Sequence, residues 1–181
     1  IFMSEHIFIS YSRVDSVFAD QLAVDLGSRG YNVWIDQAVS RGGEAWREEI
    51  ELKVREAREV VVILSEGAIA SQWVDHIGWL AFSRGKKIIP LALAPDLAFP
   101  DWANKDQAVA CNSADSYPQA LDALIVSLYP PSVQIDERLA DIRARLQTTE
   151  NDAGLSRLHL ELEALLRPFP KKDQPLEGKL L

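Results

Sequence analysis

The sequence has few residues of the kinds that crosslink a fold, hold a metal ion or bind nucleic acid. It contains one cysteine, Cys111, which excludes an internal disulfide and any cluster of cysteine ligands. Its three histidines, His6, His76 and His159, are scattered, so a zinc site lacks ligands. No dense run of lysine or arginine interrupts the net charge of -8, which makes nucleic acid an unfavourable partner.

Long hydrophobic runs are also missing. The longest apolar runs, such as 60–64, are far shorter than a membrane-spanning helix, so no membrane span is expected. The single cysteine and the lack of a leader-like apolar start favour a reducing, cytoplasmic location. What is present is a globular composition, with 48% hydrophobic and 25% charged residues in 181 positions, enough for one domain and an appendage.

Short apolar runs alternate with amphipathic segments along most of the chain. These runs predict strands at residues 6–12, 31–36, 59–65, 86–93 and 107–111. Pro90 lies inside the fourth run and predicts that this strand ends there or forms an irregular edge. Helices are expected to begin near Asp15, a reasonable N-cap, near Glu44 and near Ala70, with a closing helix at 117–129. The alternation predicts an α/β fold, a flavodoxin-like five-stranded parallel sheet with helices on both faces.

The predicted domain organisation follows from the ends of these segments. Functional loops are expected at the carboxyl ends of the strands, here residues 12–15, 37–43 and 66–71. Adjacent prolines at 130–131 mark a boundary, which divides the chain into a domain at 3–129, a helical hairpin at 130–167 and a tail or linker at 168–181. The helices of the hairpin are too short to be stable alone, so they are expected to pack on the main domain, on a second copy or on a partner.

A series of short motifs runs through the first domain in a characteristic order. They are FISYSRVD at 8–15, GYNVWID at 30–36, GGE at 42–44, VVVILS at 60–65, SQWV at 71–74 and GKKIIPL at 85–91. Together they resemble the Toll/interleukin-1 receptor (TIR) domain family, and specifically its bacterial members, over residues 6–128. The resemblance implies a role in immune or virulence signalling through self-association or contact with other TIR domains. Some family members are adaptors, whereas others hydrolyse or cyclise NAD at the bond between nicotinamide and ribose.

The enzymatic members depend on a glutamate four residues after the tryptophan of the SxWV motif. Its carboxylate stabilises the oxocarbenium-like ribose that forms when nicotinamide departs. Counting from Trp73 reaches Ile77, which carries no charge. In a second alignment the glutamate is absent between His76 and Ile77, because Ile77-Gly78-Trp79 matches an I-G-aromatic sequence of relatives. In both alignments the carboxylate is missing, so the resemblance implies NAD as a possible substrate, no cofactor, and little or no hydrolysis.

Other positions match the remaining site residues of the family. The candidate substrate-binding residues are Ser12, Arg13, Asp36, Gly42, Gly43, Trp46 and Trp73. The candidate contacts with another TIR domain are Gln37, Arg41, Asp75 and His76. Such tryptophans are more often core anchors than ligand contacts, since aromatic rings at helical spacing mainly bury area. Glu44 and Glu66 are the acids that could replace the missing one, whereas Asp75 lies about 200° around the helix from position 77.

Three functions therefore stay open. The first is a self-associating signalling or defence domain with the architecture of an NAD hydrolase but without its carboxylate, which Arg13 favours. The second is a non-enzymatic adaptor that acts through TIR–TIR contacts, which Ile77 favours. The third is a sensor that binds a nucleotide without cleaving it.

Overall fold

The structure is a computed structural model that describes residues 6–35, 44–131, 140–147, 154–156 and 159. The chain divides into two compact units, Ile1–Pro131 and Ser132–Leu181. In the second unit, residues 140–147 and 154–156 are helical, and the rest of the predicted hairpin and tail lies outside the described residues. No helix in the described ranges is long and apolar enough to span a bilayer.

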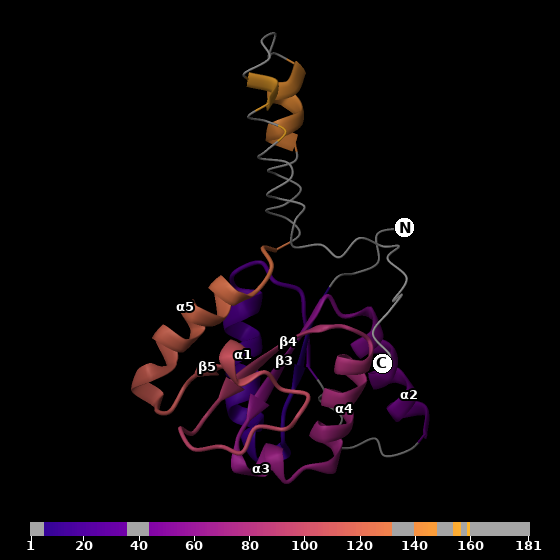
Figure 1. Cartoon of the computed structure of the whole chain (residues 1–181), viewed down its shortest axis with the longest axis vertical. Coiled ribbons are helices and arrows are strands. Elements are labelled where there is room, and N and C mark those ends of the chain that lie inside the picture. Colours follow the sequence, from indigo (N-terminus) through magenta and orange to yellow (C-terminus); the bar gives the residue numbers. More distant parts are fainter. Residues whose placement is uncertain (1–5, 36–43, 132–139, 148–153, 157–158, 160–181) are drawn as a thin grey trace, which may run out of the picture. The chain divides into compact units, whose positions relative to one another are not determined.

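The first unit alternates strands and helices along its length (Figure 1). Its strands are β1 (Ile7–Ser10), β2 (Val33–Ile35), β3 (Glu59–Leu64), β4 (Lys87–Ala92) and β5 (Val109–Ala110). Its helices are α1 (Ser16–Gly27), α2 (Glu44–Glu56), α3 (Glu66–Ile69), α4 (Gln72–Ser83) and α5 (Tyr117–Ser127). The strands form one five-stranded sheet in the order β2-β1-β3-β4-β5, and every pairing is parallel. The predicted flavodoxin-like fold is confirmed.

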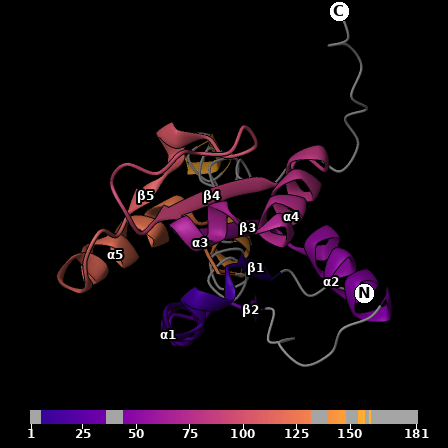
Figure 2. The ribbon, with the colours of Figure 1, turned by 90° about the horizontal axis from the view of Figure 1, so that it is seen from below.

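Helices cover both faces of this sheet, with α1 and α5 on one side and α2 and α4 on the other (Figure 2). Alternate strand residues face each core: Ile9 and Ile63 pack with α1 and α5, whereas Phe8 and Val62 pack with α2 and α4. All of β3 is buried because its residues pack on both sides, which accounts for its continuous β-branched sequence.

The prediction that β4 ends at Pro90 is wrong, whereas the alternative, a local edge, agrees with the short pairing of β4 with β5. The strand continues past the proline and lies inside the sheet, between β3 and β5. The N–H of Leu93 donates to Leu64 at the β3 side, whereas the carbonyl of Ala92 accepts from Cys111 at the β5 side. The backbone N–H and C=O groups of successive strand residues point toward opposite neighbouring strands. Pro90 lies two residues before Ala92, so its backbone nitrogen points toward the β5 side. β5 pairs only with the last two residues of β4, so the missing N–H of Pro90 removes no ladder hydrogen bond.

Two local predictions after the strands also need correction. The segment 66–71, predicted as a loop, contains the one-turn helix α3, which is too short to show a hydrophobic period. It forms because the hydroxyl of Ser65 accepts the N–H of Ala68 at 3.0 Å. Asp15 occupies the N-cap position of α1, as predicted, but its side chain makes no capping hydrogen bond. Its carboxylate instead accepts a hydrogen bond of 2.6 Å from the Ser65 hydroxyl.

Candidate functional site

The loops that follow β1 and β3 are joined into one surface at the carboxyl edge of the sheet. The hydrogen bond from Ser65 to Asp15 connects them, and Gly67 lets them approach closely. A Cβ atom at Gly67 would lie 2.6 Å from Val14 Cγ2 and 3.4 Å from Ser12 Oγ, so any larger residue would push the loops apart. Ser12, predicted as a site residue, is therefore held against the first turn of α3.

Arg13 lies on the same surface and is exposed. No hydrogen bond or ion pair to another described residue holds its guanidinium group. A cation is therefore presented at the edge where ligands of open α/β sheets bind. The predicted site residues between β2 and α2 lie outside the described residues; they are Asp36, Gln37, Arg41, Gly42 and Gly43.

The two predicted tryptophans come together between α2 and α4. The rings of Trp46 and Trp73 stack with their centroids 4.8 Å apart and their planes 27° apart. Trp73 also stacks with His76, at 5.4 Å and 29°. Both tryptophans are half-buried, so they anchor the packing of the two helices. The indole N–H of Trp46 is buried and lacks a hydrogen-bond partner among the described residues, which is a costly state for a donor.

A carboxylate that the sequence did not single out lies beside these rings. Oε1 of Glu51, on α2, lies 3.1 Å from Nε2 of His76 on α4. Its other oxygen accepts a hydrogen bond of 3.2 Å from Arg55. The mixed charges of α2 are typical of a solvated helix face, and sequence spacing alone does not show that Glu51 meets His76. The contact between Glu51 and His76 connects α2 to α4, and the carboxylate of Glu51 contacts both His76 and Arg55.

Ile77, the counted position of the catalytic glutamate, is fully buried at 0% exposure. It belongs to a continuous buried stripe of α4 formed by Val74, Ile77, Gly78 and Ala81. This spacing of three, four and seven residues is that of a regular core-facing helix. Four residues after Trp73, the helix therefore presents its apolar face to the sheet, and the chain without the glutamate packs in an unbroken register.

Asp75, predicted to contact another TIR domain, makes a hydrogen bond to another residue of the first unit. Its Oδ1 accepts a hydrogen bond of 2.8 Å from the indole N–H of Trp102, a buried residue in the loop between β4 and β5. The same indole lies against Gly78, where an added Cβ would be 2.2 Å from the ring. Of the two acids considered as substitutes, Glu66 is exposed in the first turn of α3, and the side chain of Glu44 lies outside the described residues.

These features define an open α/β domain whose candidate site lies at the carboxyl edge of a parallel sheet. Residues 7–125 match the family model described as the TIR domain, and the chain belongs to this family. A comparison with curated proteins gives no match.

A solved structure supports the same fold. The chain is similar to the TIR domain of the Toll-related receptor TRR-2 from Hydra magnipapillata, with a TM-score of 0.55, 18% identity, and coverage of 66% of this chain and 94% of that one. It also matches the TIR domains of the activated Roq1 resistosome, which recognises the pathogen effector XopQ, with a TM-score of 0.45, 16% identity, and coverage of 90% and 99%. A 2-deoxyribosyltransferase from Bacillus psychrosaccharolyticus matches with a TM-score of 0.39, 16% identity, and coverage of 54% and 87%. The last two scores are too low to carry an argument.

Proposed function

We propose that this protein is a TIR signalling module that acts by associating with other TIR domains and keeps the architecture of NAD-cleaving relatives without their carboxylate. The observation that carries the proposal is the position of Ile77. This residue is buried in the core with 0% exposure, and α4 packs in a regular register around it. An isoleucine in this position supplies no charge to a reacting ribose.

The remaining groups at the carboxyl edge support binding more than cleavage. The exposed guanidinium of Arg13 suits the phosphates of a dinucleotide. The buried N–H of Trp46 suits an acceptor on a bound ligand. Departure of nicotinamide requires negative charge beside the ribose, and losing one electrostatic stabiliser of this kind lowers a rate by about 10²–10³-fold. We therefore expect NAD to bind weakly and to remain uncleaved.

The proposal also covers the origin of the protein, its pathway and its location in the cell. The motifs that resemble bacterial TIR domains support a bacterial protein of an immune or virulence pathway that works in the cytoplasm. The alternative, a pure adaptor that never binds NAD, is favoured by the contacts of Glu51, because His76 and Arg55 occupy both carboxylate oxygens of this acid beside the stacked rings. The two proposals differ in one measurable property, which is the binding of NAD.

Nicotinamide release from NAD, measured at high protein concentration, tests the proposal. Insertion of a glutamate after His76 would restore the family spacing, but it would rotate the rest of α4 by about 100° and break its buried stripe. The variant His76→Glu adds a carboxylate beside Trp73 without shifting the helix, and His76→Gln is its uncharged control. We expect no release from the unmodified chain or from His76→Gln, and slow release from His76→Glu. Release by the unmodified chain would overturn the proposal.

Association is tested by sedimentation velocity over a wide range of protein concentration, with and without NAD. We expect the mean sedimentation coefficient to rise with concentration, because the proposed function requires contact between TIR domains. A shift of this equilibrium by NAD would favour a cleft that binds nucleotide, and no shift would favour the adaptor. A monomer at every concentration would contradict self-association and would leave contact with a different TIR domain as the function.

A further inference from the structure

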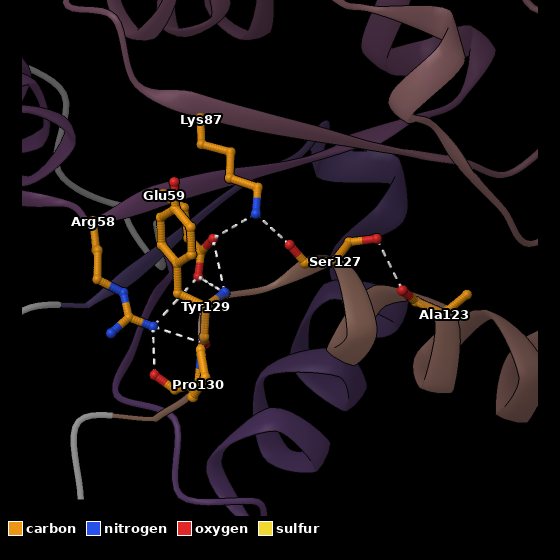
Figure 3. Close-up of polar contacts among 7 residues, drawn as sticks. All are labelled: Arg58, Glu59, Lys87, Ala123, Ser127, Tyr129 and Pro130. Atoms are coloured by element: carbon orange, nitrogen blue, oxygen red, sulfur yellow. Dashed lines mark hydrogen bonds and ion pairs between the residues drawn. The ribbon is translucent and has the colours of Figure 1, made fainter. Parts of the chain in front are cut away.

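A buried charged cluster lies at the amino-terminal edge of the sheet (Figure 3), at the opposite end from the candidate site. Its centre is Glu59, the first residue of β3, whose side chain is 0% exposed. The carboxylate accepts the backbone N–H of Tyr129, with distances of 3.0 and 3.3 Å to its two oxygens. Tyr129 follows the end of α5, so an acid of the sheet binds the backbone of a segment 70 residues away.

Two cations complete the cluster from neighbouring positions. Nη2 of Arg58 lies 3.6 Å from Glu59 and donates to the carbonyls of Tyr129 and Pro130 at 2.8 Å each. Nζ of Lys87, the first residue of β4, lies 3.8 Å from Glu59 and donates to the carbonyl of Ser127. Both cations also lie over the ring of Tyr129, at 5.4 Å for Arg58 and 4.1 Å for Lys87.

The backbone that these side chains hold is the last part of the first unit. Leu128 and Pro131 are buried, and Pro131 packs near Gly30, at the turn between α1 and β2. The carbonyls at the end of a helix have no partner within the helix, so here Lys87 and Arg58 supply donors for this stretch. The segment is therefore held by polar contacts from the starts of β3 and β4 and by packing against the turn before β2.

We propose that Arg58, Glu59 and Lys87 form an ionic clamp that holds the exit segment 128–131 on the amino-terminal edge of the sheet. The clamp fixes the last described residues of the first unit on β3 and β4. The clamp does not depend on whether the protein cleaves NAD, since none of its residues lies in the candidate site.

Amide hydrogen exchange on the full chain tests the clamp residue by residue. Glu59→Gln keeps the shape of the side chain but replaces a charged acceptor with a neutral one, and hydrogen bonds to charged groups are roughly twice as strong. We expect exchange of the Tyr129 amide to become about ten-fold faster, while the amides of Val61 and Ile63 in the middle of β3 keep their protection. Lys87→Met, which alters a partly exposed side chain, should act in the same direction.

Glu51→Gln is the matched control, because it neutralises a partly exposed glutamate that pairs with His76 and Arg55 on the surface. Exchange at Tyr129 should be unchanged in this variant. Two results would overturn the clamp. One is unchanged exchange at Tyr129 in both Glu59→Gln and Lys87→Met. The other is faster exchange at Tyr129 only in step with Val61 and Ile63, which would mean that the cluster supports the whole sheet and does not hold the exit separately.

Discussion

Replacement of Arg58 by methionine should destabilise the first unit far more than an ordinary loss of a surface charge. The side chain of Arg58 is 8% exposed and that of Glu59 is 0% exposed, so the variant leaves a buried carboxylate with one remaining cation. Removing one partner of a buried pair costs about 3–5 kcal/mol, because the other charge stays uncompensated. Arg55→Met is the matched control, since Arg55 is 45% exposed and pairs with a surface glutamate. Its cost should be under about 1 kcal/mol.

The assay is urea unfolding followed by tryptophan fluorescence. All five tryptophans of the chain lie before residue 103, so the signal reports the first unit. A double-mutant cycle with Glu59→Gln then separates the ion pair from the two carbonyl hydrogen bonds of Arg58. We expect Arg58→Met to cost clearly less in the Glu59→Gln background. An equal cost in both backgrounds, or a cost no larger than that of Arg55→Met, would refute the reasoning.

The same variant should show a pH dependence with a definite sign. Burial raises the pKa of Glu59 above its ordinary value of 4.5, against the opposing effects of Arg58, the Tyr129 N–H and Lys87. Because the folded-state pKa lies above the unfolded one, proton uptake by Glu59 stabilises the folded state as pH falls through the folded pKa toward 4.5. Without Arg58 the pKa should rise further, so the penalty of Arg58→Met is largest near neutral pH and shrinks in acid. The neighbouring hydroxyl of Tyr31, whose pKa burial also raises, stays neutral in this range.

Two other substitutions test the packing described above. Gly78→Ala places a Cβ 2.2 Å from the buried ring of Trp102 and should lower the free energy of urea unfolding by about 1–3 kcal/mol. Gly27→Ala is the control, because nothing lies within 4 Å of its added Cβ, and it should be neutral or slightly stabilising. Equal effects of the two variants would contradict the close approach of Trp102 to Gly78. Tyr117→Phe removes a hydrogen bond of 2.6 Å to Asp25, the main cause of the lowered pKa of that carboxyl. NMR titration should show the pKa of Asp25 moving upward, and an unmoved pKa would contradict the role of Tyr117. The variant should also lose about 1 kcal/mol of folding stability above pH 3.8. This loss should disappear as pH falls through the lowered folded-state pKa.

Much of the candidate site could be predicted from the sequence, because motifs at the ends of strands lie together whenever the strands are parallel. This reasoning predicted the loops at 12–15 and 66–71, whereas Ser12, Arg13, Trp46 and Trp73 were singled out by their match to TIR site residues. Glu51 was missed, because its contact with His76 depends on how α2 packs beside α4. A helix with charges along one side gives no signal of which charge meets a neighbouring helix.

The buried cluster around Glu59 shows a different limit. The sequence places this acid at the start of an apolar run, and nothing in that run shows which residues would meet its carboxylate. In the fold it is fully buried, because the segment after α5 returns across the edge of the sheet and covers it. Its partners are next to it in sequence, on a neighbouring strand and 70 residues away. No local pattern connects these three positions.

By itself the sequence determined the alternation of strands and helices, the parallel sheet and the family, because hydrophobic periodicity and short motifs are local properties of a chain. Only the tertiary structure decided which way each side chain faces. It turned Ile77 into the core, placed Pro90 where no neighbouring strand needs its N–H, and packed Trp102 on Gly78. The physical reason is that burial and hydrogen bonding depend on which segments become neighbours, and that is set by the packing of the whole domain.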